Sequence, residues 1–231
     1  MFQSLIADVS QCAVCRAWPA RPLCDGCVSR FAQPGPRCTR CALPVPAGIV
    51  RCGRCLVDPP PLDACHAAVT YDYPWSELIA QFKFHGQAGW AQAFATLMRS
   101  APWIEPVLED ADVALPIPLS RERLAERGFN QALQLAKRLA PQRTDASLLL
   151  RIRHTPAQSA LDLKSRVANV KGAFALDPLR PDAVRGKKVV LIDDVMTSGA
   201  SIHAAARVLR DAGAAKVAAV VFARTGEPGQ E

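Results

Sequence analysis

The sequence lacks any long apolar run and any leader-like start. Half of its 231 residues are hydrophobic, yet no apolar stretch approaches the roughly 18 residues that a membrane-spanning helix requires. The first residues also lack the basic flank and apolar segment of a secretory signal. We therefore expect neither a membrane span nor a signal peptide, and we expect the protein to be cytoplasmic.

Large apolar side chains are scarce in residues 1–60, which could not fold around a core of their own. This segment instead carries four Cys-x-x-Cys pairs, separated by eight, ten and ten residues: Cys12 and Cys15, Cys24 and Cys27, Cys38 and Cys41, and Cys52 and Cys55. This spacing lets two thiolates reach one metal ion. Eight thiolates predict two zinc sites. Since cysteine fills every position and leaves none for water, we expect the zinc to be structural and necessary for folding.

Two other roles for these cysteines are disfavoured. A disulfide framework is opposed by the missing signal peptide and a reducing cytosol, and an iron–sulfur cluster is disfavoured by the zinc-ribbon spacing. We expect sequential pairing, with the first two pairs on one zinc ion and the last two on the other, because each half is then compact. Interleaved pairing is the alternative. Cys65 is left over, and we expect it to be a buried free thiol.

Positive charge is concentrated in the middle of the chain. Residues 121–171 hold eleven Lys and Arg against four Asp and Glu, an excess of seven that equals the net charge of the whole chain. Such a segment suits pyrophosphate or nucleic acid, and a solvated face without a partner is the plain alternative. The cysteine-rich segment adds seven arginines against three aspartates, and Trp18 or Phe31 could stack on bases.

Beyond Pro59–Pro61, strand-like and helix-like patterns alternate. We expect strands at 67–73, 113–118, 147–153, 170–176, 189–192 and 217–222, helices at 75–84, 90–98, 130–140 and 202–209, and a loop with a short helix over 154–170. Alternation of this kind predicts a parallel sheet covered by helices.

The stretch from Val189 to Ser201 carries the clearest chemistry. Its apolar strand ends in Asp193 and Asp194, at the sheet edge where open α/β sheets bind ligands. The turn that follows offers free N–H groups, hydroxyls and a helix start, which suit a phosphate; it comprises Thr197, Ser198, Gly199, Ala200 and Ser201. Carboxylates would repel a phosphate unless they bind Mg²⁺ or sugar hydroxyls, so the pattern describes a phosphorylated ribose. The plain alternative, a capped strand-turn-helix, has no need of paired aspartates.

This stretch resembles the phosphoribosyl-pyrophosphate (PRPP) signature of type I phosphoribosyltransferases and meets it at every position. The resemblance implies that Asp193 and Asp194, with Mg²⁺, fix the ribose, and that residues 197–201 hold the 5′-phosphate. It also implies that a loop at 118–127 touches the pyrophosphate, with Arg121 and Arg127 as candidates, and that a mobile basic loop at 153–166 closes over the site. Arg127 could equally pair with a neighbouring Glu on the surface. No residue stands out as a general base.

Three further blocks narrow the resemblance: Pro116–Leu119 with Glu126–Gln131, Arg153–Gln158 with Arg166–Phe174, and Tyr71–Tyr73 with Phe82–Gly86. Together with the cysteine pairs they resemble the ComF family of competence proteins, over almost the whole chain. The resemblance implies an α/β fold: a type I phosphoribosyltransferase-like parallel sheet flanked by helices at 61–231, with a small double zinc-ribbon domain at 1–60. Eight paired cysteines suggest two ribbons, whereas some relatives have one.

The family resemblance implies a PRPP-binding protein that acts in DNA uptake and natural transformation. Its expected partners are PRPP, single-stranded DNA and a DNA helicase or recombination mediator. One alternative is an active phosphoribosyltransferase of nucleotide metabolism, which displaces pyrophosphate from ribose C1. Two others are a non-catalytic zinc-ribbon module that binds DNA or serves as an adaptor, and a PRPP sensor without turnover. The motif does not decide among them.

Overall fold

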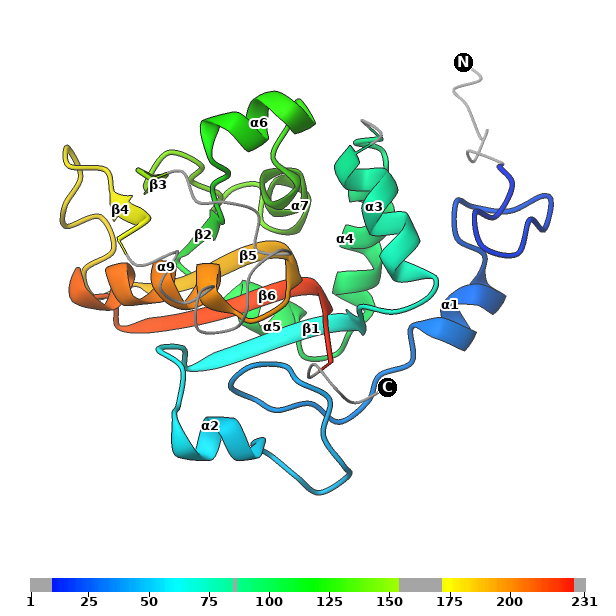
Figure 1. The fold of residues 1–231 in the computed structure, drawn as a ribbon, viewed down its shortest axis with the longest axis horizontal. Coiled ribbons are helices and arrows are strands. Elements are labelled where there is room, and N and C mark those ends of the chain that lie inside the picture. The colour runs from blue at the N-terminus through cyan, green and yellow to red at the C-terminus, as the bar shows by residue number, and fades with distance from the viewer. Residues whose placement is uncertain (1–9, 85–86, 154–171, 227–231) are drawn as a thin grey trace, which may run out of the picture.

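The computed structural model describes residues 10–84, 87–153 and 172–226 (Figure 1). Its helices and strands follow one another as α1 (Asp25–Phe31), α2 (Gly53–Val57), β1 (Ala64–Thr70), α3 (Trp75–Phe84), α4 (Trp90–Ser100), α5 (Glu105–Asp110), β2 (Val113–Pro116), α6 (Arg121–Arg127), α7 (Gln131–Leu139), β3 (Leu149–Arg151), β4 (Phe174–Leu176), β5 (Lys188–Met196), α9 (Ala200–Asp211) and β6 (Lys216–Arg224).

The main sheet has four parallel strands in the order β1-β6-β5-β2. Its central strands, β5 and β6, are almost continuously apolar and buried, as strands of a parallel sheet with both faces covered must be. β3 and β4 form a separate antiparallel pair. The predicted α/β fold with a helix-flanked parallel sheet is therefore confirmed.

Helices cover both faces of this sheet (Figure 1). On one face, α3, α4 and α7 pack against Ile192 of β5 and Phe222 of β6. On the other, α9 packs against Leu191 and Ala219 of the same strands. Neighbouring residues of a strand point to opposite faces, so the run of apolar residues in β5 serves both layers at once.

The two cysteine-rich segments pack on different parts of this core. The first lies beside α3, where the indole N–H of Trp75 donates to the Phe31 carbonyl at 2.9 Å. The second lies along β1, where the N–H of Cys65 donates to the Thr39 carbonyl at 2.9 Å. Cysteines of this second segment share a buried cluster with the α9 face of the sheet. Cys65 itself is buried and carries a free thiol, as expected.

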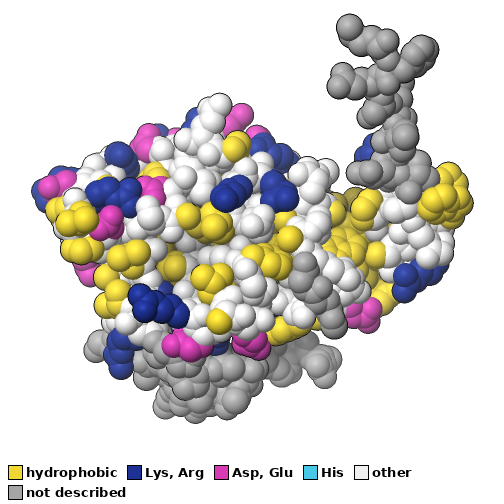
Figure 2. Space-filling model, turned by 90° about the horizontal axis from the view of Figure 1, so that it is seen from above, with side chains coloured by type: hydrophobic (Ala, Val, Ile, Leu, Met, Phe, Trp, Pro, Cys, Tyr) yellow, Lys and Arg dark blue, Asp and Glu magenta, His cyan; other side chains and the backbone are white. Residues whose placement is uncertain are grey.

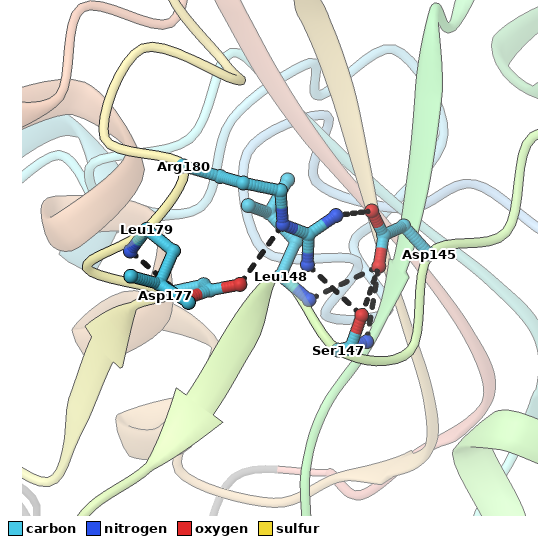
Figure 3. A network of polar contacts seen from close by, with 6 residues as sticks. All are labelled: Asp145, Ser147, Leu148, Asp177, Leu179 and Arg180. Carbon is cyan, nitrogen blue, oxygen red and sulfur yellow. Dashed lines mark hydrogen bonds and ion pairs between the residues drawn. The ribbon is translucent and has the colours of Figure 1, made fainter.

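A polar network closes the β3–β4 pair (Figure 3). The Arg180 guanidinium donates to Asp145 at 2.6 Å, to Asp177 at 2.9 Å and to the Ser147 hydroxyl at 2.9 Å. The other oxygen of Asp145 accepts from the N–H groups of Ser147 and Leu148. One guanidinium therefore joins the segment that enters β3 to the segment that leaves β4.

The helices predicted from apolar spacing are all present, and α3 agrees at both ends. Four further helices, α1, α2, α5 and α6, were not predicted. The expected pyrophosphate loop at 118–127 is largely α6, which has no buried residue and therefore no apolar stripe. Its signals were its caps: the Ser120 hydroxyl accepts from the N–H of Arg123, and Gly128 has a φ of 76°. The predicted loop at 154–170 lies outside the described residues, and the domain boundary at residue 60 stays a prediction.

Candidate functional site

The eight paired cysteines form two clusters of four, grouped sequentially: Cys12, Cys15, Cys24 and Cys27, and then Cys38, Cys41, Cys52 and Cys55. Within each cluster one sulfur per residue lies within 4.8 Å of the other three. Sulfur separations of 3.8 Å, 3.6 Å and 3.7 Å occur across the pairs. A tetrahedral zinc ion with bonds of about 2.3 Å places its sulfurs roughly 3.8 Å apart. Both clusters therefore have the geometry to hold structural zinc.

The shifted pKa values of thiols in the first cluster also suit a bound cation. Burial and the neighbouring thiols of Cys15 and Cys24 raise the pKa of Cys27 to about 12. Burial also acts to raise the pKa of Cys12, but the N–H groups of Cys15 and Cys24 outweigh it and lower that pKa to about 6. Four thiolates so close together repel one another, and a divalent metal ion at their centre offsets half of their charge.

The acidic pair lies near the end of β5, where Asp193 and Asp194 point to opposite faces of the strand. Asp194 is buried, and its Oδ2 lies 3.2 Å from the Lys83 Nζ of α3. Burial and the adjacent Asp194 carboxylate raise the pKa of Asp193, although Lys83 partly opposes the shift. A carboxyl held this way favours a partner that brings positive charge or hydroxyl donors.

The turn after β5 depends on a left-handed glycine. Gly199 has a φ of 79° and a ψ of 0° and directly precedes α9. A Cβ atom there would lie 2.5 Å from the Met196 Cε and 2.8 Å from the His203 ring, and the left-handed φ is one that L side chains rarely adopt, so the position favours glycine. The Ser198 hydroxyl accepts from the N–H of Ala200 at 3.3 Å.

A hollow joins the turn to the acidic strand. Its lining includes Asp193, Met196, Thr197, Gly199, Ala200 and Ser201. Asp193 and most of the predicted phosphate-binding residues are therefore brought together, whereas Asp194 lies on the side of Lys83 and outside this lining. The hollow presents a helix start and a carboxylate to the same small volume, which suits a phosphate joined to a hydroxylated sugar.

The two predicted pyrophosphate residues both lie on α6. Arg121 is exposed. Arg127 donates to the Gln131 amide oxygen at 3.2 Å, and its guanidinium lies over the Phe84 ring at 5.4 Å. Asn130 caps α7, where its side chain accepts from the N–H of Leu133. Asn130 and Gln131 thus make cap and packing contacts.

Three basic residues near the acidic pair were missed. Lys83 was seen only as the end of a helix, because its contact with Asp194 crosses from α3 to β5. Arg123 of α6 and Arg151 of β3 lie close enough for the Asp193 charge to act on the pKa of each guanidinium, against the lowering by burial. No local motif marks these residues, since only the packing of distant elements brings them to the site.

Arg224, at the end of β6, was also missed. Its Nε donates to the Cys41 carbonyl at 2.9 Å, and its Nη1 donates to the carbonyls of Thr197 at 2.6 Å and Met196 at 3.2 Å. It is buried. One side chain therefore bridges the second cysteine cluster and the start of the phosphate-type turn.

The surface charge on the side seen from above α6 and α7 is mixed. Figure 2 shows basic side chains interspersed with acidic and apolar ones over the part of this face that the structure describes. Basic side chains thus form no uniform patch over the described part of this face (Figure 2). A scan of the described helices finds none with the length and apolarity to cross a bilayer.

A family model described as "Phosphoribosyl transferase domain" matches residues 124–231, and this match together with the helix-covered parallel sheet defines a protein with a phosphoribosyltransferase domain. The DNA utilization protein YhgH of Salmonella typhimurium is 32% identical over 209 residues, which cover 88% of this chain and 90% of the relative. Competence protein F of Haemophilus influenzae is 30% identical over 84% of this chain and 87% of its own.

Competence protein ComFC of Bacillus subtilis is 31% identical over 94% of this chain and 90% of its own. Identity of this degree over most of each chain shows common descent. The protein therefore belongs to the ComF family of competence and DNA utilization proteins, as its sequence motifs predicted.

Proposed function

We propose that the hollow after β5 binds PRPP with Mg²⁺. The observation that supports this best is the left-handed Gly199 turn, which follows shortly after two aspartates at the carboxyl end of a buried parallel strand. An ordinary helix cap needs neither the aspartates nor the close packing against Gly199. Together they suit a ligand that is a phosphate at one end and a hydroxylated sugar at the other.

The residues divide this work by chemistry. Asp193 and Asp194 accept hydrogen bonds from the ribose hydroxyls, and the N–H groups and hydroxyls of residues 197–201 donate to the 5′-phosphate. Bound Mg²⁺ neutralises part of the pyrophosphate charge. Arg121 and Arg127 are the pyrophosphate candidates from the sequence, and Arg123 and Arg151 join them because they lie near Asp193.

We propose further that the protein acts in the cytoplasm during DNA uptake and natural transformation. The names of its relatives, which speak of competence and DNA utilization, support this role. In this proposal a zinc-ribbon domain at 1–60 and a PRPP-binding domain at 61–231 work together on single-stranded DNA or with a DNA-processing partner, such as a helicase or recombination mediator.

Titration calorimetry with PRPP and Mg²⁺ tests the binding site. The wild-type protein is expected to bind, and the double variant Asp193→Asn with Asp194→Asn is expected to lose binding while keeping its circular dichroism spectrum. The matched control is Glu109→Gln with Asp211→Asn, which removes the same charge from exposed positions and should bind like wild type. Unchanged affinity in the aspartate double variant would refute the site.

A pyrophosphate-release assay across candidate nucleobase acceptors separates binding from turnover. Release that depends on an acceptor would assign a phosphoribosyltransferase activity in nucleotide metabolism. Binding of PRPP without release would assign a PRPP-responsive protein of DNA uptake. The Asp193→Asn variant is the blank for either result.

A further inference from the structure

A second cleft lies on the other side of the turn after β5. It runs between the second cysteine cluster and the start of α9, and we call it the basic cleft. The residues that define it are Arg54 of α2, His203 and Arg207 of α9, Arg224 of β6, and Thr197 and Ser198 of the turn. The hollow proposed for PRPP shares Thr197 and Met196 with this cleft but none of its basic residues.

Arginines outnumber carboxylates in the lining of the basic cleft, which also includes Cys41, Cys52 and Cys55 of the second cysteine cluster. Arg54, Arg207 and Arg224 come from three separate elements, and Asp58 is the one carboxylate in the described lining. Arg54 and Arg207 are exposed, and in the described part of the chain neither guanidinium has an ion-pair partner. Converging guanidinium groups repel one another and attract anions into a cleft with apolar walls.

His203 adds an unpaired polar atom to the same place. Its Nε2 is buried and has no hydrogen-bond partner among the described residues. Burial, together with Arg54, Arg207 and Arg224, lowers the pKa of His203 to about 4, so the imidazole is neutral at pH 7. Buried polar atoms in proteins nearly always have a partner, so this atom is an unusual feature of a side chain that lines the basic cleft.

We propose that the basic cleft binds the phosphate of a nucleotide, supplied either as a free nucleotide or as part of single-stranded DNA. The assignment rests on the proposed role in DNA uptake for the identity of the anion. Guanidinium groups bind phosphate with paired hydrogen bonds, and Arg54 of α2 and Arg207 of α9 both line the cleft. Leu43 and Pro59–Pro61 supply apolar surface for the sugar or base.

This arrangement places two anion sites on either side of one turn. The hollow takes the 5′-phosphate of PRPP, and the basic cleft takes the second phosphate-bearing ligand. Arg224 donates to the Thr197 carbonyl from the floor of the cleft. A ligand in the cleft therefore meets the back of the turn that holds PRPP.

The test uses the full-length, zinc-loaded protein with PRPP and Mg²⁺ present in excess. One arm measures anisotropy of a fluorescein-labelled oligothymidylate of about 15 nucleotides, and the other measures calorimetry with thymidine 5′-monophosphate. Arg54→Gln with Arg207→Gln should weaken binding at least about tenfold and reduce the salt slope by about two between roughly 50 and 200 mM salt. The matched control is Arg51→Gln with Lys187→Gln, which removes two exposed charges outside the cleft lining.

Each outcome decides the proposal. If the double variant weakens binding of the oligonucleotide alone, the result supports single-stranded DNA as the ligand. If it weakens binding of the mononucleotide as well, the result supports a free nucleotide. Wild-type protein that binds neither probe, a double variant that binds like wild type, or a control that weakens equally would each overturn it. PRPP affinity, measured separately, should be unchanged in the double variant. A parallel loss of PRPP affinity would show that the cleft and the PRPP site are a single site. Wild-type protein that fails to bind PRPP but still shows the oligonucleotide effect would refute the proposed PRPP function alone.

Discussion

At the residue scale, a lysine from another element provides the counterion for the buried member of the acidic pair. The side chains of Lys83 and Asp194 are 18% and 8% exposed, and their charged atoms lie 3.2 Å apart. A buried ion pair adds little net stability, but removal of one partner leaves an uncompensated charge. Lys83 therefore provides a counterion for the buried Asp194 carboxylate near the end of β5.

The Lys83→Met variant should lose about 2–4 kcal/mol of unfolding free energy, because it leaves the Asp194 carboxylate buried without a counterion. It should also bind PRPP more weakly. Urea denaturation of the single variants and of Lys83→Met combined with Asp194→Asn measures the coupling. The double variant is expected to recover part of the lost stability, and a strictly additive cycle would contradict the ion pair.

Gly199→Ala should damage both the turn and the ligand site. The alanine Cβ would lie 2.5 Å from the Met196 Cε. The turn would also hold alanine at a φ of 79°, a strained conformation that costs on the order of 1–3 kcal/mol. We expect a lower melting temperature and a loss of PRPP affinity of at least about tenfold. Gly35→Ala is the control, since its added Cβ meets nothing within 4 Å. PRPP binding equal to wild type in Gly199→Ala would show that the turn does not hold the ligand.

At the scale of elements, the β3–β4 pair depends on Arg180. Burial would raise the pKa of Asp145, but hydrogen bonds from Arg180 and Ser147 outweigh it and lower the pKa. The backbone N–H of Leu179 and the guanidinium of Arg180 likewise lower the pKa of Asp177. A lowered pKa in the folded state contributes stability above the unfolded pKa of about 4, and this stability is lost as the pH falls through the folded value.

Arg180→Met should therefore lower the melting temperature by a few degrees at pH 7. The difference from wild type should shrink as the pH falls below about 4, because the carboxylates are then protonated in both proteins. Differential scanning calorimetry across this range measures it. Arg185→Met is the control, because its ion pair with Asp182 is far more exposed. An Arg180 effect that does not depend on pH would point to lost packing instead.

At the scale of the whole molecule, the second cysteine cluster and the candidate PRPP site form one structural unit. The cluster is buried, shares the α9 side of the core and reaches the turn through Arg224, which donates to the carbonyls of Cys41 and Thr197. The first cluster is more exposed and lies beside α3. Loss of metal from the two clusters should therefore have different effects.

Metal analysis of the purified protein should find about two zinc ions per chain. Loss of zinc from the second cluster should weaken PRPP binding, because the Cys41 carbonyl would no longer position Arg224 against the turn. Cys52→Ser tests this by calorimetry with PRPP and Mg²⁺, and Cys15→Ser in the first cluster is its counterpart. Equal losses in both variants would indicate general unfolding, and one zinc ion or none per chain would refute the double ribbon.

Much of this molecule follows from local sequence. The Cys-x-x-Cys pairs, the apolar run of β5, the paired aspartates and the glycine turn are each short segments whose chemistry is complete within a few residues. Apolar spacing also located α3, α4, α7 and α9. It could not locate α6, which buries nothing, so that only its caps, Ser120 and Gly128, mark it.

Only the tertiary structure decided which distant charges meet. Lys83 reaches Asp194, Arg224 reaches the Cys41 carbonyl, and Arg54 and Arg207 line the same cleft. Each of these arrangements joins residues that lie far apart in the chain, and it exists because the fold packs their elements together. A single sequence records the ends of such contacts as ordinary basic residues, since the physical reason for the contact is the packing between them.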